Sequence, residues 1–330
     1  MMARTVAPMS DAPQPRPLRI GVSACVLGRE VRYDGGHKRD RFVTDELGAH
    51  CTWVEVCPEV ELGLGVPRPT LRLVDGDDGV RMVTTDGATD HTEAMRRFAA
   101  ERAEALAGLD LDGFILKSRS PSCGMERVKV YGDGPVPRYD GAGLFASALA
   151  RRLPHLPVEE AGRLHDAGLR ERFLTWAHAW RRWRELAGEG FTVRGLMDFH
   201  RRYKLVLMAR SPARTTALGR LLGEAARGDD PAALAGRYLD GFTEVMRLLP
   251  STGRHVNVLE HAAGYVSDKL TDEDRGELTE SIAAYRRGEV PLVVPLTLLK
   301  HHVRRLGVDY VLAQQYLSPE PAALGLFNEL

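Results

Sequence analysis

Short apolar runs alternate with longer amphipathic stretches in the first half of the chain. The runs at 18–22, 52–56, 80–84 and 113–117 are rich in Val, Ile, Leu and aromatic residues, a pattern typical of short β-strands. Between them, residues 92–109 repeat apolar side chains at helical spacing after a polar start. This alternation predicts an α/β domain, Rossmann-like with a mostly parallel sheet, in which 80–84 is an edge strand.

The pattern changes at the proline-containing break over 154–157. Residues 158–160 are interpreted as a connection between two domains. Beyond them, apolar side chains recur almost only at helical spacing, so the second domain is predicted to be all-α. Trp176, Trp180 and Trp183 follow this spacing and are interpreted as core residues. The predicted helices cover residues 169–186, 193–209, 215–227, 232–249, 272–287 and 296–306.

The length of 330 residues agrees with two domains of ordinary size. We assign them to residues 18–155 and 156–330, after an Ala-, Pro- and Ser-containing leader over 1–17 that is expected to be disordered rather than a signal peptide. No run of about 18 apolar residues predicts a membrane span. A cytoplasmic location is expected. Because disulfides are rare there, the four cysteines are interpreted as ligands, nucleophiles or core thiols.

Three of the cysteines follow predicted strands. Cys25 and Cys57 come shortly after the first two, and Cys123 lies in a Ser-, Pro- and Gly-containing loop after 113–117. Because ligand sites of open α/β sheets collect beyond the carboxyl ends of the strands, these cysteines are expected to converge although they are far apart in the sequence. Cys51 precedes its strand and is interpreted as a packing residue.

Converging thiolates favour an iron–sulfur cluster or zinc, because both accept soft sulfur ligands. A structural zinc site usually has four ligands in paired, close spacings, and this chain has no Cys-x-x-Cys. Three thiolates on a cubane cluster would leave one iron free to bind a soft atom such as sulfur. The alternative is that the three cysteines are ordinary buried core residues.

Three sequence motifs resemble the thiouracil desulfidase family. They are Ser-Ala-Cys-Val-Leu-Gly at 23–28 with Val-Arg-Tyr-Asp-Gly at 31–35, Val-Cys-Pro-Glu at 56–59 with Arg68-Pro69, and Leu-Lys-Ser-Arg-Ser-Pro-Ser-Cys-Gly at 116–124. The resemblance covers about residues 18–155. It implies a [4Fe-4S] cluster coordinated by Cys25, Cys57 and Cys123, whose free iron takes sulfur from a thiolated pyrimidine.

The second half resembles the YbgA-like domain, which has no known function. The matching residues are Phe199-His200 with Lys204, Arg-His-Val-Asn-Val-Leu-Glu-His at 254–261, Gly264-Tyr265, Tyr-Arg-Arg-Gly at 285–288 and Tyr316-Leu317. Arg210 departs from the family pattern, in which a His is expected after the Leu-Met-Ala run. The fusion of the two halves resembles the tRNA 4-thiouridine desulfidases, which implies that 4-thiouridine in tRNA is the substrate and uridine the product.

Exchanging the sulfur of a thiolated uracil for oxygen requires an activated water and a group that carries protons. Glu59, two residues after Cys57, is the candidate general base; the alternative is a carboxylate that stabilises a helix N-terminus beginning at Pro58. Ser120 and Ser122 either position the pyrimidine and hydrogen-bond the cluster, or cap their loop. Candidate contacts to substrate phosphate or ring oxygen are Arg32, Arg68 and Lys117, with a plain surface role as the alternative.

The charge distribution favours the helical half as the part that binds RNA. The net charge of the chain is zero, but residues 170–214 contain eleven Arg or Lys against four Asp or Glu. RNA binding uses cations for the phosphates and aromatic side chains for stacking. The candidate RNA contacts are His200, Arg201, Arg202, Lys204, Arg254, His255 and Tyr265. The alternative is a solvated helix surface.

Three functions remain open on the sequence alone. The first is desulfurisation of 4-thiouridine in tRNA. The second is the same chemistry on free thiouracil or a thiolated nucleotide, with the helical half serving assembly or stability. The third is an iron–sulfur sensing or binding module without turnover. The basic helical half favours the first over the second, and Glu59 beside an open iron argues against the third.

Overall fold

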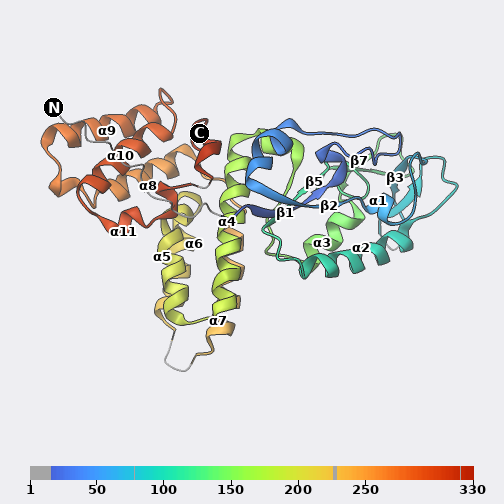
Figure 1. The fold of residues 1–330 in the computed structure, drawn as a ribbon, viewed down its shortest axis with the longest axis horizontal. Helices are drawn as coiled ribbons and strands as arrows, with labels where there is room; N and C mark the ends of the chain where they lie inside the picture. Colours follow the sequence, from blue (N-terminus) through green and yellow to red (C-terminus); the bar gives the residue numbers. More distant parts are fainter. Residues whose placement is uncertain (1–15, 78, 226–228, 320) are drawn as a thin grey trace, which may run out of the picture.

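The computed structural model describes residues 16–77, 79–225, 229–319 and 321–330. Residues 1–15 of the predicted leader lie outside the described residues. Figure 1 shows two halves side by side, an α/β half in blue to green and a helical half in yellow to red, with helix α4 (Ala167–Glu189) between them. The predicted α/β domain followed by an all-α domain is confirmed. No helix of the described residues is long and apolar enough to cross a bilayer.

The main sheet consists of parallel strands in the order β2-β1-β5-β8. The sequence pattern predicts the first three of them. The interpretation of 158–160 as a connection is wrong, because this segment pairs with β5, and the Phe114 N–H donates to the Pro157 carbonyl (2.8 Å). The segment is too short and too acidic for its pattern to indicate a strand. The strands are β1 (Leu18–Ser23), β2 (Cys51–Val56), β5 (Gly113–Leu116) and β8 (Val158–Glu160).

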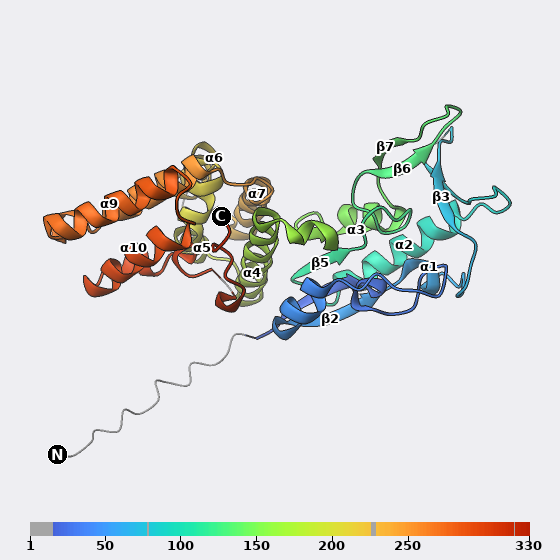
Figure 2. The same ribbon diagram turned by 90° about the horizontal axis from the view of Figure 1, so that it is seen from above.

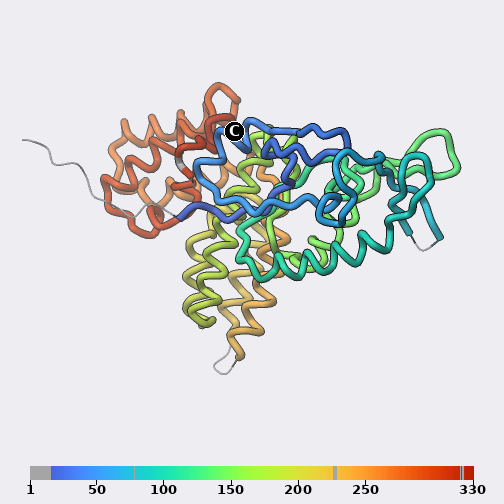
Figure 3. Tube along the Cα trace, turned by 45° about the vertical axis from the view of Figure 1, so that its right-hand side comes forward, coloured from blue at the N-terminus to red at the C-terminus, as the bar shows by residue number. Residues whose placement is uncertain are grey.

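Helices cover both faces of this sheet. On one face lie α2 (Thr92–Ala107), which matches the prediction, and α3 (Leu144–Arg152), which the pattern misses. Figure 3 shows α2 running along the α/β half. The alternate side chains of β1, among them Ile20, face the other way and share a core with Phe173 of α4. The two halves of the protein therefore have a continuous hydrophobic core.

A second, smaller sheet lies at the end of the α/β half that is far from the helical half (Figure 2). Its order is β4-β3-β6-β7, with the parallel pair β3 and β6 between two antiparallel neighbours. Strand β4 is the predicted edge strand, whereas the other three strands were not predicted. One face packs through Leu73, Met82 and Val130 against Met95 of α2. The strands are β3 (Leu71–Val74), β4 (Arg81–Thr84), β6 (Val128–Tyr131) and β7 (Arg138–Gly141).

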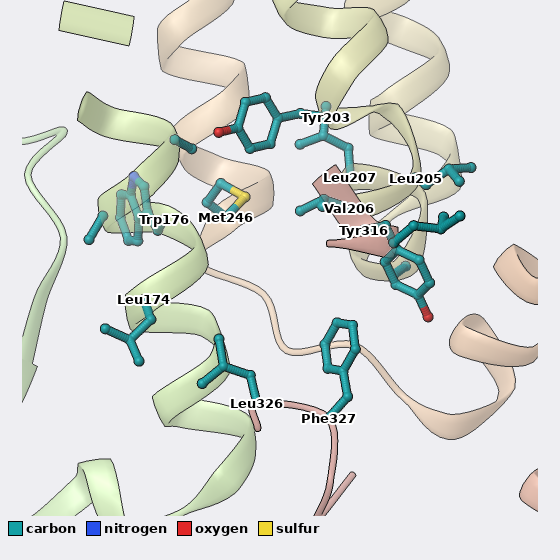
Figure 4. Packing of buried hydrophobic residues seen from close by; sticks show 14 of the residues in the cluster. Leu174, Trp176, Tyr203, Leu205, Val206, Leu207, Met246, Tyr316, Leu326 and Phe327 are labelled. Carbon is teal, nitrogen blue, oxygen red and sulfur yellow. The ribbon is translucent and has the colours of Figure 1, made fainter. Parts of the chain in front are cut away.

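The helical half contains every helix predicted for it, with residues 226 and 227 of the predicted 215–227 helix outside the described part of the chain, and in addition α8 and α11. Figure 4 shows part of its core, in which Tyr203 of α5, Trp176 of α4 and Phe327 near the C-terminus are buried. Trp183 is also buried and Trp180 is partly buried, as predicted. The helices after α4 are α5 (Val193–Arg210), α6 (Pro212–Gly223), α7 (Pro231–Met246), α8 (Thr252–Ala263), α9 (Asp272–Arg286), α10 (Val293–Arg305) and α11 (Asp309–Leu312).

Helix α4 docks on the edge of the main sheet at which β5 begins. Trp180 Nε1 donates to the Leu111 carbonyl (3.1 Å). Arg181 donates to Asp112 through Nε (3.1 Å) and Nη2 (2.7 Å), and both side chains are buried. Arg184 also pairs with Asp112. Because β5 starts directly after Asp112, this junction lies at the amino-terminal edge of the sheet, opposite the edge at which the strands end.

Asp112→Ala is expected to destabilise the protein by about 3–5 kcal/mol, because it leaves the buried charge of Arg181 without its main partner. The midpoint of denaturant unfolding, followed by circular dichroism, measures the effect. Glu104→Ala breaks an exposed ion pair with Arg152 and is the matched control, which should leave the midpoint nearly unchanged. Equal midpoints for the two variants would contradict the role of Asp112 at the junction.

Candidate active site

Three cysteines follow three neighbouring strands of the main sheet. Cys25 lies in a 3-10 turn, η1 (Ala24–Leu27), directly after β1. Cys57 is the N-cap of the short helix α1 (Pro58–Glu61), directly after β2. Cys123 lies in the loop after β5. Because β2, β1 and β5 are parallel neighbours, all three cysteines follow strand ends at the same edge of the sheet.

A cavity of about 200 Å³ opens at this edge, and all three cysteines line it. Gly28 ends η1 in the left-handed conformation (φ 94°), which turns the chain back after Cys25. The thiols therefore share one small space with ionisable side chains from several loops. The other lining residues include Arg32, Tyr33, Glu59, Arg68, Lys117, Arg119 and Ser120.

Burial governs the protonation of the three thiols. It raises the pKa of Cys25 to about 11, with the negative charge of Cys57 as the next cause. Burial also raises the pKa of Cys57, and it raises that of Cys123 well above its usual value, with the charge of Glu59 second. Thiolates at this edge disfavour one another, so a bound cation would stabilise them. The described residues contain no group of three or more His, Cys, Asp or Glu side chains arranged to hold a metal ion.

Glu59 is held through both carboxylate oxygens. Arg68 donates to Oε2 through Nε (3.0 Å) and Nη2 (2.5 Å), and the Ser122 hydroxyl donates to Oε1 (2.6 Å). The Arg68 side chain is 3% exposed and also donates to the carbonyls of Gly65 (2.8 Å) and Val31 (3.0 Å). Its guanidinium is engaged in holding Glu59 and the local backbone. Arg68 also lines the cavity, and its contact with a substrate phosphate or ring oxygen stays a prediction.

The position of Glu59 agrees with both interpretations of this residue. It stands in the first turn of α1, in which Pro58 is the first residue. It also lines the cavity, with 16% of its side chain exposed. Glu61 on the same helix accepts a hydrogen bond from the Cys57 N–H (2.9 Å), which fixes the helix start at this cysteine. Glu59 is thus the carboxylate in the cavity, and Glu61 is the carboxylate that caps the helix.

The two serines of the Cys123 loop differ in position. Ser120 lines the cavity, but its Oγ accepts hydrogen bonds from the N–H groups of Ser122 and Cys123 (3.2 Å each), so it caps the turn. Ser122 is fully buried and reaches the site through its bond to Glu59. A side-chain carbon on Gly143 would lie 2.3 Å from the Ser122 carbonyl, so this glycine permits the tight packing behind the loop. The catalytic role of Ser122 stays a prediction, and its hydroxyl contacts the site through Glu59.

Lys117 and Arg32 contribute positive charge to the cavity wall. Burial lowers the pKa of Lys117, while the nearby cysteine thiolates raise it. Arg32 pairs with Asp34 (3.1 Å) and lies over the ring of Tyr33 (5.2 Å to the centroid). Sequence reasoning missed Tyr33 as a cavity residue, although its place within the 31–35 motif was an available signal.

Two of the RNA contacts predicted in the helical half are not on its surface. His255 is 4% exposed and hydrogen-bonded to the Tyr316 hydroxyl (2.7 Å), and its contact with RNA stays a prediction. His200 is half-buried, its Nδ1 lies 3.1 Å from the Tyr238 hydroxyl, and burial lowers its pKa to about 4. Both rings serve packing contacts between helices.

Arg210, which departs from the family pattern, belongs to a buried ion pair. Its side chain is 1% exposed and Nη2 donates to both carboxylate oxygens of Glu171 (3.0 and 2.7 Å). The pair joins α5 to α4 inside the core. The arginine that replaces the expected histidine therefore has a structural role in this chain, as the partner of Glu171.

The remaining predicted RNA contacts lie at or near the surface of α5 and α8, away from the cavity. Arg201 pairs with Asp198 (3.1 Å), which offsets its charge. Lys204 is half-buried, and its charge acts on His261 and Tyr265. None of these side chains lines the cysteine cavity. The exposed members are Arg201, Arg202, Arg254 and Tyr265.

The α/β half matches a family of known description. Residues 20–161 match the family model of 2-thiouracil desulfurase. The chain is also 33% identical over 113 residues to the uncharacterized protein YbbK of Bacillus subtilis (strain 168), which covers 72% of that protein and 32% of this chain. The chain belongs to the 2-thiouracil desulfurase family. The 2-thiouracil desulfurase match begins within β1 and ends directly after β8, so it includes residues of all four strands of the main sheet.

Further similarities concern each half separately. A solved structure of the "[4Fe-4S]-dependent thiouracil desulfidase TudS" is 33% identical and covers 45% of this chain and 93% of its own, with a TM-score of 0.37. Residues 204–321 match the family model DUF1722, a protein of unknown function. The uncharacterized protein YbgA of Escherichia coli (strain K12) is 29% identical over 141 residues, 43% of this chain and 83% of that protein. The protein joins a desulfurase half to a YbgA-like half, as the motifs predict.

Proposed function

We propose that the protein removes the sulfur atom of 4-thiouridine in tRNA and leaves uridine. The observation that carries the proposal is the single cavity lined by Cys25, Cys57, Cys123 and Glu59, in a member of the 2-thiouracil desulfurase family. In the reaction, C4=S and water give C4=O and hydrogen sulfide. One carbon–sulfur double bond is broken and one carbon–oxygen double bond is formed, without net oxidation or reduction.

The three cysteines fit a [4Fe-4S] cluster. Their sulfur atoms are soft ligands, they come from three chain segments around one cavity, and burial disfavours their thiolate forms unless a cation lies nearby. A cubane is larger than a single ion, so ligands spread around a cavity wall suit it better than they suit one metal ion. When bound through three cysteines, such a cluster supplies an iron that is open to the thiocarbonyl sulfur.

Glu59 is the group best placed to move protons. Oε2 accepts two hydrogen bonds from Arg68 and Oε1 accepts one from Ser122, so of the about four acceptor positions of a carboxylate one remains, on Oε1, for a water. A water held there would give a proton to the carboxylate as its oxygen attacks C4, and the carboxylate would pass this proton to the departing sulfur. Arg68 and Ser122 keep the carboxylate oriented toward the cavity during both transfers.

A nucleotide inside tRNA is favoured over a free base by the second half of the chain. A base in tRNA has to leave its stack, which costs a few kcal/mol and calls for contacts to the flanking backbone. The YbgA-like half adds a surface with Arg202, Lys204 and Tyr265, which an enzyme of free bases does not need. The resemblance of the two-domain fusion to tRNA 4-thiouridine desulfidases points the same way.

Anaerobic incubation of the cluster-loaded protein with cellular tRNA is expected to convert 4-thiouridine to uridine, as measured by chromatography of the digested nucleosides. Cys57→Ala protein is the control and should leave the 4-thiouridine content unchanged. Free 4-thiouracil is tested in parallel. Loss of the free base alone would favour the free-base alternative, and loss of neither substrate would favour a sensing or binding module without turnover.

A further inference from the structure

A second hollow lies beside the cysteine cavity, on the small sheet. Its volume is about 1030 Å³, and it shares Leu71, Arg119 and Pro121 with the wall of the cysteine cavity. The two spaces are therefore neighbours, and the side chains that they share come from the start of β3 and from the Cys123 loop. Figure 2 shows the small sheet at the end of the α/β half, away from the helices of the second half.

This hollow is lined by cations and aromatic rings, and no carboxylate of the described residues belongs to its wall. The Arg72 guanidinium lies over the Tyr131 ring (5.3 Å to the centroid), and the Lys129 ammonium lies over the Tyr139 ring (5.7 Å). Tyr139 is 56% exposed. We name this surface the basic sheet face. Its charged and aromatic members are Arg72, Arg119, Arg127, Lys129, Tyr131 and Tyr139.

The cations of the basic sheet face are only weakly balanced by carboxylates, because the charge of Arg72 acts on Asp86 and that of Arg119 on Glu160 without forming an ion pair. Within the part of the chain that the structure describes, none of Arg72, Arg119, Arg127 and Lys129 forms an ion pair, whereas the neighbouring Arg138 of β7 pairs with two aspartates. Arg72 Nε is buried and has no hydrogen-bond partner there. Four unpaired cations on one face repel one another, so the face is complementary to a polyanion.

The arginines at its rim are held in an unusual backbone conformation. Arg119 and Arg127 adopt positive φ angles of 57° and 54°, which non-glycine residues take up at a cost when surrounding contacts impose it. Both belong to the loop between β5 and β6 that also carries Cys123. Arg119 lines the cysteine cavity as well, so one cation stands where the two spaces meet.

We propose that the basic sheet face holds the RNA backbone on both sides of the thiolated nucleotide while its base enters the cysteine cavity. The inference rests on the proposed function, since it assigns the surface that carries the tRNA substrate. The unpaired cations neutralise phosphates, and the tyrosine rings stack on bases next to the extruded one. The desulfurase half then grips the RNA itself, and α5 is not the main RNA surface.

Arg127→Glu combined with Lys129→Glu tests this surface, because both side chains are exposed and carry no structural ion pair among the described residues. Fluorescence anisotropy of labelled, unthiolated tRNA with the full-length protein measures affinity over a series of salt concentrations. The double variant is expected to bind at least about tenfold more weakly, and the slope of log K against log salt should fall by about 1.5, since two phosphate contacts are lost. An unchanged visible spectrum shows that the fold around the cysteines is intact.

Two comparison variants locate the effect. Arg97→Glu with Arg151→Glu makes the same change of charge on exposed positions of α2 and α3 and should bind like the parent. Arg201→Glu with Arg202→Glu makes the same change of charge on α5. If the α2–α3 variant bound tRNA as weakly as the double variant of the basic sheet face, the effect would come from the net charge of the protein. If only the α5 variant bound tRNA more weakly, the RNA surface would lie on α5. Either result would overturn the inference. Parent protein that binds tRNA through the face but leaves 4-thiouridine intact would refute the proposed function alone.

Discussion

Replacing Cys25, Cys57 or Cys123 with alanine is expected to remove most of the iron and to abolish desulfurisation. Each thiol comes from a different strand end, and no fourth cysteine is among the described residues that line the cavity, so no neighbouring thiol can replace a missing one. The parent protein, prepared anaerobically, should contain about four irons per chain and absorb broadly in the visible range, as cubane clusters do. Iron analysis and the spectrum measure the loss.

Cys51→Ala is the matched control for these variants. Cys51 is buried at the start of β2 and packs in the core shared with the helical half, not in the cavity wall. The Cys51→Ala protein should keep its iron and its activity. Full activity with stoichiometric zinc in place of iron, or four irons retained in a Cys57→Ala protein, would contradict the cluster assignment.

Glu59→Gln is expected to lower kcat on thiolated tRNA by about 10²-fold or more while the iron content stays at the parent level. The amide has nearly the shape of the carboxylate, and its oxygen can still accept the Ser122 hydrogen bond. It cannot take a proton from water, however, and it no longer neutralises the buried Arg68. Single-turnover rates of nucleoside conversion measure the chemical effect, and thermal unfolding measures any loss of stability separately.

Glu61→Gln provides the comparison on the same helix. Glu61 accepts a hydrogen bond from the Cys57 N–H and pairs with Arg102 (2.9 Å), so its replacement disturbs the cap of α1 without touching the cavity wall. Its turnover should remain within a few-fold of the parent. If both variants lost activity equally, the effect would belong to the helix start rather than to proton transfer at Glu59.

The arrangement of the cysteines is predictable because it depends on strong local patterns. The apolar runs before Cys25, Cys57 and Cys123 predict parallel neighbouring strands, and the parallel order then brings the strand ends together. The hydrophobic spacing of α4 likewise identifies Trp176 and Trp183 as core residues, and both are buried. Both inferences depend on the periodicity of apolar side chains, which is a local property of the sequence and does not depend on contacts with distant residues.

The contacts of Glu59 could not be predicted in the same way. Its partner Ser122 is 63 residues away, and Arg68 reaches it from a loop without regular structure. Nothing in local composition distinguishes Ser122, which orients the carboxylate, from Ser120, which caps a turn. The basic sheet face was missed for a related reason, since its cations are scattered between residues 72 and 129 and become neighbours only through strand pairing.

Strand β8 has a consequence for how the two halves can be separated. It completes the main sheet with residues that follow the predicted domain boundary, and Glu159 within it pairs with Arg163 and with Arg172 of α4. A fragment ending at residue 155 would uncover the edge of β5, which is a template for pairing with another chain. Recombination of the gene at that point would therefore not exchange one self-contained module for another. The desulfurase half carries its last strand on the far side of the apparent linker, so a cut that leaves its sheet complete has to lie after residue 160.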